Sequence, residues 1–139
     1  YCPITEDRIR HLFGDQRYVE SWPTEYTGVH IVQSYGANTA VWNIQNYEVS
    51  IRNNKVYINE YPLTFYHFSG LTIISRKEFN LNWYYRIEDE RVLNFIYKPY
   101  IITLVNVMKD MEKHFPWFNA GFLPREYTPD THYFVMEDQ

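Results

Sequence analysis

The stretch over residues 62–70, which reads Pro-Leu-Thr-Phe-Tyr-His-Phe-Ser-Gly, most constrains what this chain can fold into. An apolar run of strand-forming residues leads directly into His67, and a Ser-Gly turn follows it. We expect a strand over 63–68, with Leu63, Phe65 and Phe68 facing a core. The segment therefore predicts that His67 lies at the end of a buried strand.

His67 admits two interpretations at that position. Gly70 has no Cβ, so another group can approach the backbone closely there. Strand ends followed by small-residue turns are where alternating α/β folds place ligands, which favours a metal or phosphate site. A lone histidine on an apolar strand is also typical of a hydrogen-bonded core residue, and the other four histidines show no metal-ligand spacing with each other. The residue pattern leaves both interpretations open.

The composition limits the function classes. The chain has 139 residues, which is one domain at most, and its net charge of −4 argues against a nucleic-acid partner. No apolar run is long enough for a transmembrane segment. The single cysteine, Cys2, excludes an internal disulfide framework and fits a reducing compartment, so we expect a cytoplasmic protein, with peripheral attachment at the inner face of the membrane as a further option.

The periodicity predicts an α/β chain. Alternating residues on both sides of Asn53-Asn54 predict a hairpin over 47–59, and Ala40 to Ile44 is expected to enter the core through Val41 and Trp42. A strand is expected over 29–32 and helices over 15–22, 91–98 and 100–115, the first closed by Pro23 and the last with one apolar stripe. We therefore expect a short mixed sheet with a hairpin, flanking helices and a long C-terminal helix over residues 1–115, then a loop-like tail over 116–139.

Two further motifs carry polar groups that suit a ligand. Asp15 and Gln16 follow a glycine, which is typical of a helix N-cap and also of side chains that project into a cleft to bind hydroxyl groups. Asn38 and Asn43 flank an Ala-Val-Trp step, and each amide donates and accepts, as recognition of a polyhydroxyl ligand requires. The same asparagines are typical of a loop pinned to its own backbone. Aromatic residues, at 19% of the chain, serve either packing or sugar binding.

Three motifs in this order give the chain a resemblance to a known family. Phe13-Gly14-Asp15-Gln16-Arg17-Tyr18, then Gly36 to Asn43, then Pro62 to Gly70 resemble the C-terminal part of the bacterial nucleotide-diphospho-sugar transferases. These are glycosyltransferases of the GT-A fold related to the glycogenin-like retaining family. The resemblance runs from Tyr1 to Gly70 and continues weakly beyond it. It implies that this chain is the acceptor-side portion of a GT-A-like fold.

The resemblance also implies roles for individual residues. His67 would be a ligand of a catalytic Mn²⁺ or Mg²⁺ beside the nucleotide diphosphate, where the ion acts as a Lewis acid on the leaving group. Asp15 and Gln16 would be catalytic residues that face the sugar or acceptor. Ser69 and Gly70 would lie against the phosphates and bind substrate. The remaining substrate-binding residues would be Asn38, Trp42 and Asn43.

The sequence departs from the family pattern in two places, the first at the expected phosphate contact and the second, which leads us to expect a fragment, at the Asp-x-Asp motif. The family often continues His-x-x-Gly with a Lys-Pro-Trp that reaches the diphosphate, whereas Gly70 is followed here by Leu71-Thr72-Ile73-Ile74. No Asp-x-Asp motif ends an apolar strand. The nucleotide-binding half would then lie upstream of Tyr1, and this chain alone would be inactive.

The predicted function is thus that of a glycosyltransferase fragment. The parent would transfer a sugar from a nucleotide-diphosphate sugar donor to a glycan or lipid-linked acceptor, with a divalent cation and with retention of configuration. A non-catalytic carbohydrate-binding or protein-interaction module is the alternative. The missing Asp-x-Asp motif and the acidic charge are compatible with that module.

Overall fold

The computed structural model describes residues 19–137, which divide into two units at Gln33. In the first unit the described residues form one short helix, α1 (Trp22–Glu25), with Pro23 in its first turn. A proline suits that position because its missing N–H has no partner in a helix start anyway. The prediction that Pro23 closes a helix is therefore wrong. The expected strand over 29–32 is also wrong, because those residues form no regular structure.

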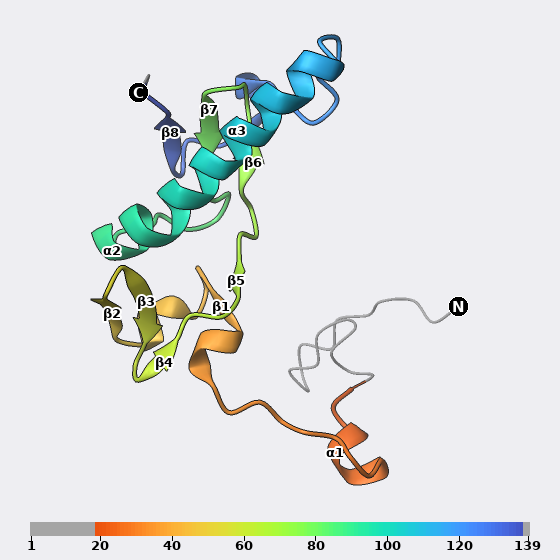
Figure 1. Ribbon diagram of the computed structural model, residues 1–139, viewed down its shortest axis with the longest axis vertical. Coiled ribbons are helices and arrows are strands. Elements are labelled where there is room, and N and C mark those ends of the chain that lie inside the picture. The colour runs from red at the N-terminus through yellow and green to blue at the C-terminus, as the bar shows by residue number, and fades with distance from the viewer. Residues whose placement is uncertain (1–18, 138–139) are drawn as a thin grey trace. The chain divides into compact units, whose positions relative to one another are not determined.

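The second unit is a mixed α/β arrangement, which confirms the coarse fold class (Figure 1). Its strands form three small sheets, and a long helix packs with them. The first sheet pairs β1 (Thr39–Ala40) with β5 (Tyr66–His67); the second joins β2 (Val49–Arg52), β3 (Lys55–Ile58) and β4 (Tyr61–Pro62); the third joins β6 (Thr72–Ile73), β7 (Glu78–Asn80) and β8 (Tyr133–Val135). Short 3-10 turns add η2 (Tyr35–Ala37), η3 (Ile44–Asn46) and η5 (Arg125–Tyr127).

The hairpin β2–β3 confirms the prediction from the alternating residues. Asn53 and Asn54 have φ values of 51° and 60°, the left-handed pair that a type I′ turn requires and that asparagine tolerates well. Val49 pairs with Ile58, and both side chains are buried. The turn chemistry and the alternation thus specify the same register.

Strand β5 is shorter than the sequence indicates. Only Tyr66 and His67 pair, in parallel with β1, and Tyr66 is the buried residue of the two. The prediction that Phe65 faces the core is wrong, because its side chain is 53% exposed. Leu63 and Phe68 are half-buried and pack against the core as expected.

The two helices predicted near the C-terminus are one continuous helix. It begins with α2 (Glu90–Val92), where Asp89 caps the end by accepting from the Arg91 amide at 2.8 Å. It continues through a π-helical turn, η4 (Leu93–Tyr97), and α3 (Lys98–His114), in which Pro99 lies in the first turn (Figure 1). Widened turns are a usual way to accommodate a proline that removes one helical hydrogen bond.

The segment after the helix is not wholly loop-like, which corrects the prediction for residues 133–135. These residues form β8, and Phe134 pairs with Phe79 in β7. Two further bonds fix the segment: the Asn80 Nδ2 donates to the Pro129 carbonyl at 2.7 Å, and the Leu81 amide donates to the His132 carbonyl at 2.9 Å. Residues 133–135 of the predicted tail are therefore part of the third sheet.

A single hydrophobic core joins the hairpin, β5, β7 and the helix. At its centre the hydroxyls of Tyr66 and Tyr97 lie 3.4 Å apart, and burial raises the pKa of both phenols. Ile101 and Val105 of α3 are buried, which confirms the predicted apolar stripe. No helix within residues 19–137 is long and apolar enough to cross a membrane.

Candidate functional site

The pairing of β1 with β5 brings two of the three sequence motifs together. Thr39 lies opposite Tyr66, and Ala40 lies opposite His67. The Gly36 carbonyl accepts from the amides of Thr64 and Phe65, at 2.8 and 3.0 Å, and so joins the turn before β1 to the segment just before β5. The small-residue turn and the segment that carries His67 therefore form one local structure.

Asn38 and Asn43 have different roles at this junction. The Asn43 side chain bonds twice to its own loop: its Oδ1 accepts from the Ala40 amide at 2.8 Å, and its Nδ2 donates to the Asn38 carbonyl at 2.9 Å. This geometry favours the loop-pinning interpretation for Asn43. The exposed Asn38 side chain instead places its Oδ1 3.2 Å from the His67 Nε2. Asn38 is therefore the asparagine whose side chain faces His67 instead of its own loop, and its substrate-binding role stays a prediction.

Two exposed aromatic rings flank His67. The Trp42 ring centroid lies 5.6 Å from the imidazole, and the Phe65 centroid lies 4.6 Å from it with the planes nearly perpendicular. Trp42 is 44% exposed, so the expectation that it enters the core is wrong, while Val41 is buried as expected. We call Asn38, Trp42, Phe65 and His67 the His67 cluster. It combines apolar ring faces with amide and imidazole hydrogen-bonding groups.

The Ser69-Gly70 turn is held by Asn82, which is fully buried. The Asn82 Nδ2 donates to the Ser69 carbonyl at 2.5 Å, and its Oδ1 accepts from the amides of Tyr84 and Tyr85. Gly70 has φ of 77°, and a Cβ there would lie 3.0 Å from the Trp83 amide nitrogen. The close approach predicted at Gly70 is thus made by the chain's own backbone, and the phosphate-facing roles of Ser69 and Gly70 remain predictions.

Sequence reasoning did not identify Asn82 as the organiser of this turn. The signal was the Asn80-Leu81-Asn82 triplet at the end of a strand. An asparagine that follows a strand and precedes bulky residues often accepts from backbone amides two and three residues ahead. Asn82 does so here, at 2.8 and 2.9 Å.

The metal prediction rests on His67 alone among the described residues. Within residues 19–137 no group of three or more His, Cys, Asp or Glu side chains could hold a metal ion. His67 offers one imidazole nitrogen, with the Asn38 amide oxygen beside it, so further ligands would have to come from elsewhere. Asp15 and Gln16 lie outside the described residues, and the roles of all three stay predictions.

His132 positions the segment that follows Asn82. Its Nδ1 accepts from the Ile87 amide at 3.0 Å, which requires an unprotonated nitrogen. Burial, and secondarily the Arg86 guanidinium, lower the pKa of His132 below 6.5. The unfolded chain binds a proton at His132 more readily than the folded chain does. The stability that the unprotonated His132 contributes is therefore fully present above pH 6.5 and is lost as the pH falls through the folded-state pKa. We expect the free energy of unfolding from urea titrations to decrease over that interval.

The variant His132→Asn keeps an acceptor for the Ile87 amide but does not titrate. It should therefore show a flatter pH dependence of stability than the wild type over the same interval. His114→Asn is the matched control for replacing a histidine by asparagine, since His114 is exposed near the end of α3. An unaltered slope in His132→Asn would contradict the assignment.

Comparisons with known proteins give two similar sequences. The uncharacterized protein YfnD of Bacillus subtilis strain 168 is 51% identical over 137 residues, which is 99% of this chain and 44% of YfnD. The uncharacterized protein YfnF of the same strain is 30% identical over 115 residues, which is 82% of this chain and 37% of YfnF. The chain thus spans less than half the length of either relative. No family model matches the sequence, and no solved structure matches it significantly.

Proposed function

We propose that this chain is the acceptor-side part of a glycosyltransferase that uses a nucleotide-diphosphate sugar as donor. The observation that carries the proposal is the His67 cluster, in which exposed Trp42 and Phe65 rings flank a histidine and an asparagine amide. Sugars have apolar ring faces and many hydroxyls, so they bind to aromatic faces with amide groups at the edge. The likeness to the nucleotide-diphospho-sugar transferase motifs supports the same function.

The proposal assigns the rest of the catalytic machinery to a longer protein. YfnD and YfnF are both more than twice as long as the segment they share with this chain, which leaves room for a nucleotide-binding half. In the proposed enzyme, which has a GT-A fold and retains configuration, His67 is one ligand of Mn²⁺ or Mg²⁺, and Asp15 and Gln16 face the substrate. The enzyme acts in the cytoplasm on a glycan or lipid-linked acceptor. With a lipid-linked acceptor it would be attached peripherally to the membrane.

The test is a transfer assay on the full-length protein that carries this chain. With uridine, guanosine and thymidine diphosphate sugars and Mn²⁺, we expect release of nucleoside diphosphate. Trp42→Ala should lower kcat/KM by about tenfold, the usual order for removing one aromatic anchor. Trp117→Ala is the matched control, because Trp117 is highly exposed and lies outside the His67 cluster. Full activity of Trp42→Ala, or no turnover of any donor, would count against the proposal.

The proposed role of His67 as a metal ligand is tested separately, by the metal dependence of the rate. His67→Ala should weaken the dependence of the rate on Mn²⁺ or Mg²⁺, whereas His114→Ala should not. An unchanged metal titration in His67→Ala would remove the metal role and leave the sugar-binding role in place. The 139-residue chain alone should bind nucleotide sugars only weakly, and micromolar binding in calorimetry would contradict the division into two parts.

A non-catalytic carbohydrate-binding or protein-interaction module is the second candidate. The observation that favours it is the exposed aromatic side chains outside the His67 cluster, among them Tyr127 at 65% and Phe115 at 49% exposure. Binding of glycans on an array by this chain, combined with a full-length protein that turns over no donor, would favour the module.

A further inference from the structure

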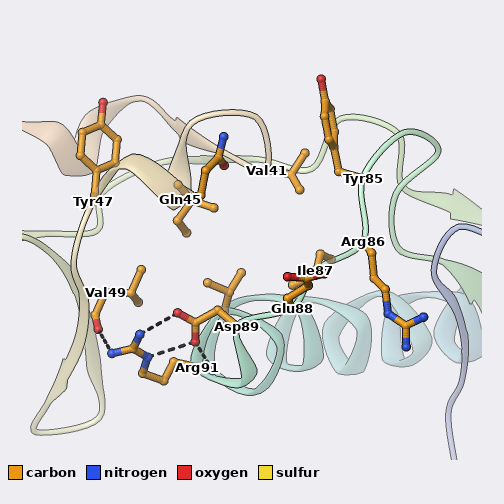
Figure 2. A pocket seen from close by; sticks show the side chains of 12 residues that line it. Val41, Gln45, Tyr47, Val49, Tyr85, Arg86, Ile87, Glu88, Asp89 and Arg91 are labelled. Atoms are coloured by element: carbon orange, nitrogen blue, oxygen red, sulfur yellow. Dashed lines mark hydrogen bonds and ion pairs between the residues drawn. The ribbon is translucent and has the colours of Figure 1, made fainter.

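A cavity of about 460 Å³ lies between the segment over 41–49 and the segment over 85–92. Its volume falls in the range of roughly 300 to 1,000 Å³ that is usual for small-ligand pockets. Figure 2 shows Tyr47 and Tyr85 at opposite sides of it, with Val41 and Gln45 between them. Five lining side chains are apolar and buried: Val41, Ile44, Val49, Ile87 and Val92.

The charges around the cavity do not suit an anionic ligand. The Arg91 guanidinium is already engaged: its Nε and one terminal nitrogen donate to the Asp89 carboxylate at 3.0 and 2.8 Å, and the other terminal nitrogen donates to the Val49 carbonyl. In Figure 2 the Arg86 guanidinium extends away from the cavity. A diphosphate needs cationic or amide donors that face it, and of the two arginines that line the cavity Arg91 is engaged by Asp89 and Val49 while Arg86 is directed away. The ligand it fits is therefore not the nucleotide part of a donor.

The uncharged polar groups, by contrast, are available. Within residues 19–137 no hydrogen bond engages the hydroxyls of Tyr47 and Tyr85, and Gln45 uses only its Nε2, which donates to the Trp42 carbonyl at 2.7 Å. The Glu88 carboxylate is exposed at the edge and accepts hydroxyl protons. Two phenol rings, one amide oxygen and one carboxylate over an apolar base match a ligand with both hydroxyls and apolar ring faces.

The position of Tyr47 is fixed by the fold. Its ring packs on Tyr35 with centroids 5.1 Å apart, and Tyr35 in turn contacts Tyr61 edge to face. One wall of the cavity is thus pre-organised, which lowers the entropic cost of binding. Tyr85, at the other side, is half exposed, but its backbone amide is held by Asn82.

We propose that this cavity is a binding subsite for a neutral saccharide, the end of the acceptor glycan. The inference rests on the proposed function, since it names where that enzyme holds its acceptor. One short loop contributes residues to both the His67 cluster and the cavity: Trp42 contacts His67, while Val41, Ile44 and Gln45 line the cavity. An acceptor held in the cavity is therefore linked by this loop to the His67 cluster, where transfer would occur.

The experiment measures saccharide binding by the 139-residue chain without any donor. A panel of neutral hexose and N-acetylhexosamine disaccharides is titrated by NMR, with uridine diphosphate as the anionic comparison. We expect at least one disaccharide, and not uridine diphosphate, to shift the amides of residues 41–49 and 85–92. Tyr85→Ala should weaken that binding by about tenfold, as expected for loss of one aromatic wall.

Tyr84→Ala is the matched control, because Tyr84 is the adjacent tyrosine, is more exposed and does not line the cavity. The affinity of the Tyr84→Ala variant for the disaccharide should stay within about twofold of that of the wild type, as expected for a residue that does not contact the ligand. No binding by any disaccharide, or equal losses in the two variants, overturns the subsite. If disaccharide binding is lost in Trp42→Ala but kept in Tyr85→Ala, the subsite is also overturned, while the proposed function is left intact. Tyr85-dependent binding beside an enzyme inert toward every donor upholds the subsite and rejects the transferase.

Discussion

Replacing Gly36 by alanine is expected to destabilise the second unit by roughly 3 kcal/mol or more, at the upper end of what one added methyl costs in a packed site. A Cβ on Gly36 would overlap the Pro62 carbonyl oxygen and lie 2.8 Å from its carbon. These atoms belong to backbone, so no side-chain rotation relieves the contact. Pro62 is also held in place, because it pairs with Tyr57 in the second sheet.

The same substitution should loosen the His67 cluster. To admit the methyl, the turn at Gly36 must move away from Pro62, which lengthens the bonds from the Thr64 and Phe65 amides to the Gly36 carbonyl. The parallel pairing of Thr39 with Tyr66 depends on those bonds, and His67 follows directly. We therefore expect both a lower urea midpoint and loss of the NMR signature of the Asn38–His67 contact.

Gly121→Ala is the control for the Gly36 variant. A Cβ on Gly121 meets nothing within 4 Å, and its backbone is not in the left-handed region. Its free energy of unfolding should stay within about 0.5 kcal/mol of the wild type. If Gly36→Ala unfolds at the wild-type urea concentration, the close packing of the turn against Pro62 is not present in solution.

Local signals in this sequence predicted local structure well. The β2–β3 hairpin followed from Asn53-Asn54 between alternating residues, because turn chemistry and side-chain alternation act over neighbouring positions. The apolar stripe of α3 followed from helical spacing for the same reason. Strand β8 was missed, since three residues after two prolines become a strand only by pairing with the distant β7.

The candidate site was predicted in its members but not in its geometry. The motifs pointed to Asn38, Trp42, Asn43 and His67, and the β1–β5 pairing does bring these four residues together. The predicted burial of Trp42 was wrong, because residues 41–43 form a turn between β1 and η3 and this turn leaves Trp42 exposed. The cavity was not visible in the sequence at all. It forms where segments some forty positions apart meet, and no short-range pattern encodes that meeting.

Replacing Asn82 by alanine is the second change with a large expected effect, about 3 kcal/mol of lost stability, because it removes the partner of three backbone groups at a buried position. The Ser69 carbonyl loses its donor, and the amides of Tyr84 and Tyr85 lose their acceptor. Asn94→Ala is the matched control. The Asn94 side chain bonds Glu90 and Lys98 on the solvent face of the helix, where water replaces the lost partner, so its cost should stay below about 0.5 kcal/mol.

Asn82→Asp separates the two halves of this network. Aspartate keeps an oxygen for the amides of Tyr84 and Tyr85, so their hydrogen exchange should stay slow, whereas in Asn82→Ala it should become fast. It also sets a carboxylate oxygen against the Ser69 carbonyl, and two acceptors at that distance repel each other. The aspartate variant should therefore be at least as unstable as the alanine variant while protecting both amides. Wild-type stability in Asn82→Asp would mean that the Ser69-Gly70 turn does not depend on the Asn82 Nδ2 donor. Rapid exchange of the Tyr84 and Tyr85 amides in both variants would mean that Asn82 does not hold the tyrosine segment that forms one wall of the cavity.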